Sequence, residues 1–279
     1  MRATVYALLS RLCSFIASCR LPGMSIQSRY VQIELTTVCN YSCFYCAGRD
    51  MPQRHMDMGV FGQIIDRLPP GGGVTVSLQG EGEPTLHPQF WDMVDAVRAK
   101  GHQTYTITNG TRVDVAQFDA GLSSVGVSID TLDAQEAERI GRFNLPKVLA
   151  NFEALFQVMG PERVTVHTVQ YGQPIAPLAA YLRNLGVRRH IVQPLQVKDD
   201  YAKRYADQAV LKELAPPPVA HYRCGFLDVP RMRFFDINGV EMPCCFIKDA
   251  SVFVSIDDLR QKLAARQIPP ACAGCRELR

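Results

Sequence analysis

Short strand-like segments alternate with longer helical ones between residues 31 and 195, and this alternation restricts the fold more than any other feature of the sequence. Several of the strand-like segments are rich in valine and isoleucine, and none is strongly charged, as in parallel strands covered on both faces. A closed barrel of this type has eight strand–helix units, so six units predict an α/β fold with a partial, open (β/α)6 barrel. The expected strands are Val31–Thr36, Val74–Gln79, Gln103–Thr108, Val125–Asp130, Arg163–Val169 and His190–Leu195.

Three of the helical segments between these strands have clear boundaries. A proline in the first turn and a glycine after the last turn are typical of helix ends. The chain length of 279 residues suits one large domain or a medium domain with a small partner. The expected helices include Pro88–Lys100, Pro146–Met159 and Pro174–Leu185, each followed directly by a glycine.

The alternation stops near residue 199, and the remaining chain has a different pattern. The Ala-Pro-Pro-Pro run at 215–218 cannot continue a helix or a central strand, so it predicts a semi-rigid linker. Beyond it, Arg231–Ile237 and Val240–Phe246 flank an Asn-Gly pair typical of a hairpin turn, and Ile256–Arg266 has a helical pattern. We expect an N-terminal extension over 1–30, a barrel over 31–214 and a small C-terminal module over 222–279.

The N-terminal residues and the overall charge restrict the partners that we expect. Residues 1–20 have basic ends and apolar middles, but Arg11 interrupts them, so no run reaches the roughly 18 apolar residues of a membrane-spanning helix. We interpret this segment as a short amphipathic helix, with Met24 as an alternative start of the chain. The net charge of +3 does not indicate nucleic-acid binding. We expect a cytoplasmic protein that binds neither membrane nor nucleic acid.

Most of the ten cysteines lie in tight clusters, which favours metal ligation over disulfide bonds in a chain of this length. Cys39, Cys43 and Cys46 form a C-x3-C-x2-C loop directly after the first expected strand. Three thiolates at this spacing can hold a cubane iron–sulfur cluster and leave one iron open to a further ligand. The alternative is a structural zinc site, but zinc normally takes four protein ligands, and the loop offers no fourth.

The loop Cys39-Asn40-Tyr41-Ser42-Cys43-Phe44-Tyr45-Cys46 resembles the signature of the radical S-adenosylmethionine (SAM) superfamily. This resemblance implies a partial (β/α)6 barrel and a [4Fe–4S] cluster whose open iron binds the amino and carboxylate groups of SAM. It also implies reductive cleavage of SAM to a 5′-deoxyadenosyl radical, and hence an electron donor such as flavodoxin or ferredoxin. Tyr45 stands where family members commonly carry an aromatic residue near the adenine.

Other motifs agree with the resemblance. The segment Gly80-Glu81-Gly82-Glu83-Pro84 is similar to the family's GGEP motif, although Glu81 stands where a glycine is common. The resemblance implies that Glu83 accepts the ammonium group of the methionine part, while glycine lets the backbone approach the cofactor. Strand ends are where barrel enzymes place active-site groups, and an arginine, Arg142 or Arg139, could reach the cofactor carboxylate. The implied cofactor contacts are Tyr45, Gly82, Glu83, Asn109, Ser128 and Arg142.

A second set of cysteines lies in the C-terminal module. Cys224, Gly239 and Cys244 have the spacing C-x14-G-x4-C, and a C-x2-C pair formed by Cys272 and Cys275 follows. The pattern resembles the SPASM/Twitch extension, and since the chain ends soon after Cys275 we expect the short, Twitch-like form with one auxiliary [4Fe–4S] cluster. Four thiolates close every iron, which leaves electron transfer or scaffolding as its role. A zinc ribbon is the alternative, because four cysteines suit tetrahedral zinc equally well.

Three cysteines stay outside these two sets. Cys13 and Cys19 lie in the N-terminal extension, and we assign them no role. Cys245 follows Cys244, and neighbours in an extended strand point to opposite faces, so we expect its thiol to remain free. A free thiol could return a hydrogen atom to a substrate radical and so act catalytically, although a buried cysteine often only packs.

Fold and cofactor do not fix the reaction. We expect hydrogen abstraction from a polar small molecule, similar to a sugar or an aminocyclitol, that leads to dehydrogenation or epimerisation. One alternative is modification of a ribosomally made peptide; because the barrel begins near residue 31, a separate partner chain would then bind the leader. The other alternative is a non-enzymatic metal-binding regulator, which would have no need for an open iron or for Glu83.

Overall fold

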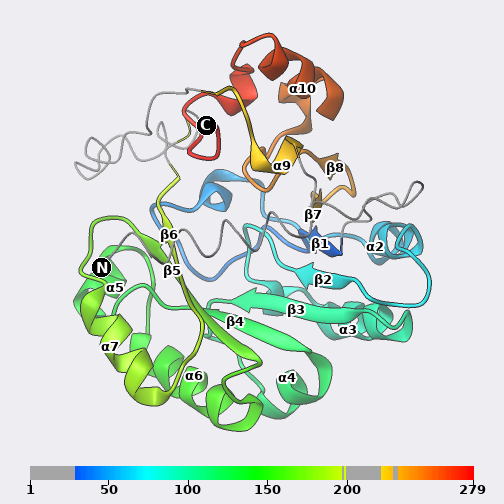
Figure 1. The fold of residues 1–279 in the computed structure, drawn as a ribbon. Helices are drawn as coiled ribbons and strands as arrows, with labels where there is room; N and C mark the ends of the chain where they lie inside the picture. Colours follow the sequence, from blue (N-terminus) through cyan, green and yellow to red (C-terminus); the bar gives the residue numbers. More distant parts are fainter. Residues whose placement is uncertain (1–28, 197, 199–220, 229–231) are drawn as a thin grey trace, which may run out of the picture.

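Seven parallel strands and one antiparallel strand form a single sheet in the order β6-β5-β4-β3-β2-β1-β7-β8 (Figure 1). The structure is a computed structural model that describes residues 29–196, 198, 221–228 and 232–279. The first six strands follow one another in chain order, which confirms the predicted partial barrel. Their bounds are β1 Tyr30–Ile33, β2 Thr75–Leu78, β3 Gln103–Thr108, β4 Ser124–Ser128, β5 Val164–Gln170 and β6 His190–Pro194.

Helices connect these strands and cover one face of the sheet (Figure 1). Aspartate side chains cap several of them: Asp57, Asp114 and Asp133 accept hydrogen bonds from the first-turn N–H groups of α2, α4 and α5. The α-helices of this part are α2 Met58–Asp66, α3 Phe90–Ala99, α4 Val115–Gly121, α5 Ala134–Arg139, α6 Leu145–Met159 and α7 Ala176–Leu185. Two short 3-10 helices lie near the strand ends, η2 Ala47–Asp50 and η3 Pro84–Leu86.

The two faces of the sheet differ in chemistry. Alternate residues along each strand point to opposite faces. One set is apolar and fully buried against the helices, and it forms the main core, with members such as Ile33, Val76, Val127 and Val166. Burial of these side chains provides most of the driving force for this part of the fold.

The face of the sheet away from the helices carries polar side chains. Gln79 Nε2 donates to Gln32 Oε1 at 3.4 Å, and the Tyr105 hydroxyl lies 2.7 Å from His167 Nε2. Burial, helped by the positive charge of Arg189, lowers the pKa of His167 to about 4, so its imidazole is neutral. This face therefore carries neutral hydrogen-bonding groups. It belongs to the same sheet whose first strand, β1, leads to the cysteine loop.

The C-terminal module joins the same sheet. Strand β7 (Met232–Phe235) pairs in parallel with β1, and β8 (Glu241–Met242) pairs antiparallel with β7, which confirms the predicted hairpin. A second hydrophobic core surrounds α10 (Ile256–Ala264) and α9 (Gly225–Asp228), so the module packs around its own apolar cluster. Two 3-10 helices complete it, η6 Ala250–Val252 and η7 Pro270–Cys272.

The second hairpin strand is shorter than predicted. We expected an extended strand through Phe246, but β8 ends at Met242 and the chain turns at Cys244 and Cys245. The prediction that Cys244 and Cys245 point to opposite faces of a strand was therefore wrong, because these two residues do not lie in a strand. Pro243 follows β8 directly and has no N–H to extend the ladder, which is a physical reason for the early end.

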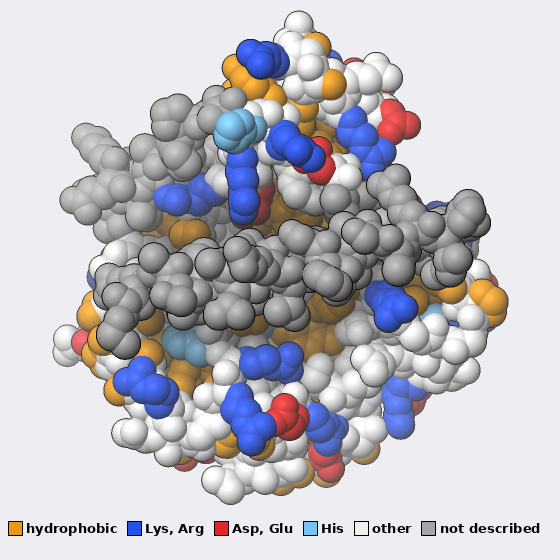
Figure 2. Space-filling model, viewed as in Figure 1, with side chains coloured by type: hydrophobic (Ala, Val, Ile, Leu, Met, Phe, Trp, Pro, Cys, Tyr) orange, Lys and Arg blue, Asp and Glu red, His pale blue; other side chains and the backbone are white. Residues whose placement is uncertain are grey.

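Several predictions fall on residues that the structure does not describe. These are the amphipathic helix before Met24, the roles of Cys13 and Cys19, and the proline linker at 215–218. In the described part of the chain, none of the helices has both the length and the apolar character needed to cross a membrane. On the face drawn in Figure 2, lysine and arginine side chains are scattered over the module and the helices rather than gathered in one patch.

Candidate active site

The cysteine loop, residues 39–46, follows β1 and lies at the carboxyl end of the parallel strands. Cys43 is buried, while Cys39 and Cys46 are partly exposed. The Cys39 sulfur accepts a hydrogen bond from the Tyr41 N–H at 3.4 Å, and Asn109 Nδ2 lies 3.9 Å from it. N–H groups directed at cysteine sulfur stabilise the thiolate form that binds metal.

Backbone hydrogen bonds fix the cysteine loop to the connection between α5 and α6. The Ser42 N–H donates to Gly141 O at 3.1 Å, and the Phe44 N–H donates to Ile140 O at 3.2 Å. Gly141 has φ +88°, a conformation that L side chains rarely adopt, and a Cβ there would collide with Ser42 O. Only glycine therefore lets this connection lie against the loop that carries the three cysteines.

We expect Gly141→Ala to destabilise the protein by about 1–3 kcal/mol and to lower its retention of iron. The new methyl group would displace the loop backbone at Ser42, between Cys39 and Cys43. Gly186→Ala is the matched control, since Gly186 has φ +87° but open space where a methyl group would lie. Thermal unfolding and iron analysis of both variants would check this. Equal iron content in the two variants would contradict the role assigned to Gly141.

Glu83 is fully enclosed by hydrogen-bond donors of the protein. Its Oε1 accepts from the Thr85 N–H, the Thr85 hydroxyl and the Thr108 hydroxyl at 3.2, 2.7 and 2.8 Å, and its Oε2 accepts from the Asn109 N–H at 2.6 Å. Burial raises the pKa of Glu83, while these hydrogen bonds oppose the shift. The carboxylate joins the ends of β2 and β3, and its contact with the SAM ammonium stays a prediction.

Gly82 allows a close approach within the protein itself. A Cβ at Gly82 would lie 2.5 Å from both Thr36 O and Val38 O, on the chain that leads to Cys39. The Gly82 N–H donates to Thr36 O at 3.0 Å, and the Glu83 N–H donates to Val38 O at 2.9 Å. The glycine thus lets the protein's own backbone pack against the motif, and the approach of the cofactor to Gly82 stays a prediction.

Asn109 links Glu83 to the cysteine loop. Besides its N–H bond to Glu83, its Nδ2 donates to Asn40 Oδ1 at 2.8 Å, next to Cys39. Its Oδ1 accepts from the Thr111 N–H and hydroxyl, and Asn40 Nδ2 donates to Thr111 Oγ1 at 2.9 Å. Asn109 is therefore bonded to both Glu83 and the cysteine loop, and its contact with the cofactor stays a prediction.

Asp130 is the central carboxylate on the other side of the loop. It is buried, and it accepts hydrogen bonds from the Tyr45 hydroxyl and, at 2.8 Å, from the Val169 N–H. Arg142 Nε lies 3.1 Å from Asp130 Oδ2, and Arg142 Nη1 donates to Ser128 O at 2.8 Å. Burial lowers the pKa of Arg142, but the charges of Asp130, Tyr45 and Cys43 together outweigh this and raise it above the usual value.

The structure separates the two candidate arginines. The Arg142 guanidinium lies over the rings of Tyr41 and Tyr45, 5.9 and 6.0 Å from their centroids, while the Arg139 side chain is half exposed and pairs with Glu136. Arg142 therefore belongs to the site. Asn109, Ser128 and Arg142, three of the predicted cofactor contacts, line one small pocket together with Asp130 and Tyr41.

The superfamily model for radical SAM proteins matches residues 33–185, which is more than half of the 279 residues. This chain belongs to the radical SAM superfamily. Membership implies a [4Fe–4S] cluster and SAM, and the three sulfur atoms of the loop, with N–H groups directed at Cys39, suit such a cluster. The strand-end carboxylates and amides described above would then surround SAM bound at the open iron.

Solved radical SAM structures share the fold. SuiB from Streptococcus suis bound to S-adenosylmethionine has a TM-score of 0.63 at 16% identity, and the match covers 98% of this chain and 73% of SuiB. SuiB bound to precursor peptide SuiA has a TM-score of 0.62 at 16% identity, and the match covers 90% of this chain and 67% of SuiB. The enzyme anSMEcpe with bound AdoMet has a TM-score of 0.54 at 15% identity, and the match covers 77% of this chain and 74% of anSMEcpe.

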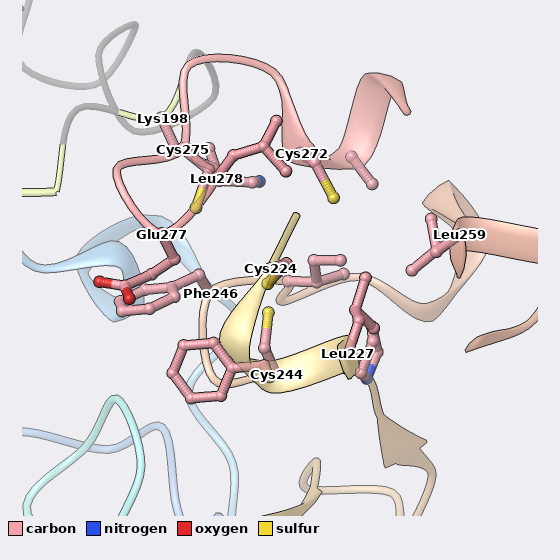
Figure 3. Close-up of a pocket in the computed structure, with 14 residues that line it drawn as sticks. Lys198, Cys224, Leu227, Cys244, Phe246, Leu259, Cys272, Cys275, Glu277 and Leu278 are labelled. Atoms are coloured by element: carbon pink, nitrogen blue, oxygen red, sulfur yellow. The ribbon is translucent and has the colours of Figure 1, made fainter. Parts of the chain in front are cut away.

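The four cysteines of the second set line one cavity in the C-terminal module of this radical SAM protein. Cys224 precedes α9, Cys244 follows β8, and Cys272 and Cys275 lie at and after η7. Figure 3 shows their sulfur atoms directed toward the middle of the cavity from two sides. Apolar side chains such as Phe226, Leu227, Ile247 and Leu259 surround them. All eight cysteines of the described residues are free, so no disulfide competes there.

The thiols of this cavity are costly to ionise without a cation. Burial, with neighbouring cysteines adding to it, raises the pKa of Cys272 to about 12 and that of Cys275 to about 11. Backbone N–H groups of Phe226 and Leu227 are directed at the Cys224 sulfur, and those of Phe246 and Ile247 at Cys244. Buried thiols with backbone N–H groups directed at their sulfur atoms suit a metal cluster, because the cluster supplies the positive charge that ionised sulfur needs.

Cys245 does not belong to this group. It is not among the described residues that line the four-cysteine cavity, and the charges that shift the pKa of its thiol are those of Lys248, Cys244 and Glu81. Burial raises the pKa of Cys245 to about 12, although Lys248 opposes the shift, so the thiol keeps its proton. Cys245 is partly buried against the apolar cluster of the module, and its catalytic role stays a prediction.

Sequence reasoning missed several residues of the site. Asp130 ends the fourth expected strand, and its position was the only available signal. Gly141 gave no signal, because its partner Ser42 is far away in the chain. The ion pair between Glu81 and Lys248 joins the barrel to the C-terminal module, and only the unusual Glu81 in a glycine position indicated it.

Proposed function

We propose that this protein is a radical SAM oxidoreductase or epimerase that abstracts a hydrogen atom from a polar small molecule, similar to a sugar or an aminocyclitol. The observation that supports this substrate class is the polar inner face of the sheet. Gln32, Gln79, Tyr105 and His167 present neutral donors and acceptors there, which suits hydroxyl and amine groups better than an apolar substrate.

The site residues divide into holding and orienting roles. Cys39, Cys43 and Cys46 would hold the cluster, which, when loaded and reduced, cleaves SAM to a 5′-deoxyadenosyl radical. Glu83 and Asn109, joined by a 2.6 Å hydrogen bond, would orient the methionine part of SAM. Tyr45 and Ser128 would lie beside its adenosine part, while Arg142, held by Asp130, would face its carboxylate.

We further propose an auxiliary [4Fe–4S] cluster on Cys224, Cys244, Cys272 and Cys275 in a Twitch-like domain. Its support is the single cavity that all four sulfur atoms share. Gln196, just after β6, connects this cavity to the barrel, since its Nε2 lies 3.9 Å from the Cys275 sulfur and its Oε1 accepts from the Arg276 N–H. A zinc ion is the alternative occupant, and metal analysis distinguishes the two.

Two outcomes can follow hydrogen abstraction from the substrate. In epimerisation, the Cys245 thiol gives a hydrogen atom to the opposite face of the substrate carbon, and the resulting thiyl group returns to thiol with an electron from the external donor and a proton from water. In dehydrogenation, the substrate radical loses a proton and an electron. We propose that the four-cysteine site, with its cluster bound, would accept this electron. The support for the first outcome is that Cys245 lies outside both sets of proposed ligands, which leaves its thiol free.

Turnover in deuterated water tests this function. Amino sugars, aminocyclitols and short peptides are each incubated with reduced enzyme and SAM, and substrate-dependent 5′-deoxyadenosine identifies the class. For an epimerase, we expect the product to contain one solvent deuterium, because a thiol hydrogen exchanges with water. Cys245→Ala should then form 5′-deoxyadenosine without inverting the substrate.

The other results are equally informative. A product two hydrogens lighter, formed equally by both proteins, would reject the donor role of Cys245 and identify a dehydrogenase. Turnover with peptides alone would reject the small-molecule class in favour of peptide modification. A protein that binds metal but forms no 5′-deoxyadenosine with any substrate would be a regulator.

A further inference from the structure

A buried ion pair connects the two cysteine sites. Glu81, in the GGEP-like motif after β2, pairs with Lys248 of the C-terminal module, and both side chains are only 15% exposed. The module supplies the cation and the barrel supplies the anion. Ion pairs that are largely withheld from water interact more strongly than those on the surface, because solvent screens them less.

Glu81 lies directly against the cysteine loop. Its Oε2 is 3.6 Å from the Cys46 sulfur and accepts a hydrogen bond from the Gly48 N–H at 3.0 Å. A Cβ at Gly48 would lie 2.5 Å from the Glu81 Cβ, so the chain just after Cys46 packs tightly on this side chain. The Glu81 N–H in turn donates to Glu34 Oε1 at 2.9 Å, which holds the backbone of the motif to β1.

Lys248 lies just beyond the module's own cysteines. It follows Cys244 and Cys245 within four residues of the chain, and it pairs with Glu81 of the barrel. Lys248 therefore places a positive charge close to the cysteines of the C-terminal module in the chain and beside Glu81 of the barrel. A carboxylate beside a metal-bound Cys46 would repel the electrons on that sulfur, and Lys248 offsets this repulsion.

We propose that Glu81 and Lys248 form a charge-balancing pair that sets the reduction potential of the cluster on Cys39, Cys43 and Cys46, and that holds the C-terminal module in place to do so. Reduction adds an electron to the cluster, so a nearby anion opposes it and a nearby cation favours it. The inference rests on the superfamily's cluster and on this ion pair, and it does not depend on the proposed substrate class.

A redox titration of the reconstituted enzyme, followed by EPR, tests the pair. The signal that changes on addition of SAM belongs to the cluster with the open iron, so the two sites are distinguished. We expect Glu81→Gln, which keeps the shape and the Gly48 hydrogen bond, to raise the reduction potential of that signal. At the wild-type midpoint potential, its ratio of reduced to oxidised cluster should rise by about threefold or more.

Removing the charge of Lys248 should shift the reduction potential in the opposite direction. Lys248→Met leaves the Glu81 charge uncompensated, so its reduction potential should fall, while Lys248→Arg should stay at the wild-type value. The double variant Glu81→Gln, Lys248→Met should lie between the two single variants, since both charges are gone. Lys262→Met is the matched control, because Lys262 pairs with Asp258 on the outer side of α10 in the same module.

A merely structural role predicts a different pattern. Loosening of the junction would move Glu81→Gln and Lys248→Met in the same direction, and that result would overturn the proposal. An unchanged potential in Glu81→Gln would overturn it as well; this variant retains the side-chain volume, and its thermal unfolding curve checks that the protein compared is folded. Absence of a second EPR signal would reject the auxiliary cluster under the proposed function while leaving this test intact.

Discussion

Replacing Cys39, Cys43 and Cys46 together with alanine should abolish formation of 5′-deoxyadenosine and remove about half of the bound iron. The reason is that we propose these three thiolates as the ligands of the cluster whose open iron binds SAM, while four other cysteines line a separate cavity. With two [4Fe–4S] clusters, the wild-type chain should hold about eight iron atoms after anaerobic reconstitution, and the triple variant about four. Iron and sulfide analysis, together with chromatography of the SAM products, measures both effects.

Two controls make the result specific. Cys245→Ala changes a cysteine outside both sets, so its iron content should equal that of the wild type. Replacing Cys224, Cys244, Cys272 and Cys275 with alanine should also leave about four iron atoms, now at the site that binds SAM. A native protein with about four iron atoms and about one zinc would contradict the auxiliary cluster and identify a zinc site in the module.

The sequence predicted the barrel because its signals are local. Short strand-like segments, several of them rich in valine and isoleucine, alternate with helical ones, and glycines follow the helices, so each element is recognisable within its own segment. The observed β3 begins and ends at the predicted residues, and α6 and α7 end where predicted. The three-cysteine loop is equally local, since its chemistry depends on spacing within eight residues.

The contacts that shape the site are not local. Asp130 is separated from Tyr45 by 85 residues, and Gly141 lies opposite Ser42 only because a helical connection folds back over the cysteine loop. The pairing of β7 with β1 places the C-terminal module on the barrel sheet, and it depends on register across most of the chain. Sequence patterns specify elements well, whereas these long-range contacts appear only once the elements are assembled.

The buried Asp130–Arg142 pair makes Asp130→Ala a second large-effect variant. Arg142 would lose its counter-ion within a largely enclosed site, and the Tyr45 hydroxyl and the Val169 N–H would lose their acceptor. Removing one partner of a buried ion pair leaves an uncompensated charge, which costs about 3–5 kcal/mol. For a chain of this size, the melting temperature should fall by roughly 6–12 °C.

Graded variants separate the charge from the hydrogen bonds. Tyr45→Phe removes only the hydroxyl, so it should cost about 1 kcal/mol. Asp119→Ala is the matched control, since Asp119 pairs with Arg163 at 2.6 Å on the surface, where an ion pair contributes about 0–1 kcal/mol. Asp130→Ala combined with Arg142→Met should be more stable than Asp130→Ala alone, because the unpaired cation is gone. If Asp130→Ala melts at the same temperature as Asp119→Ala, the Asp130–Arg142 pair does not hold the cysteine loop against β4, and the role given to Asp130 is wrong.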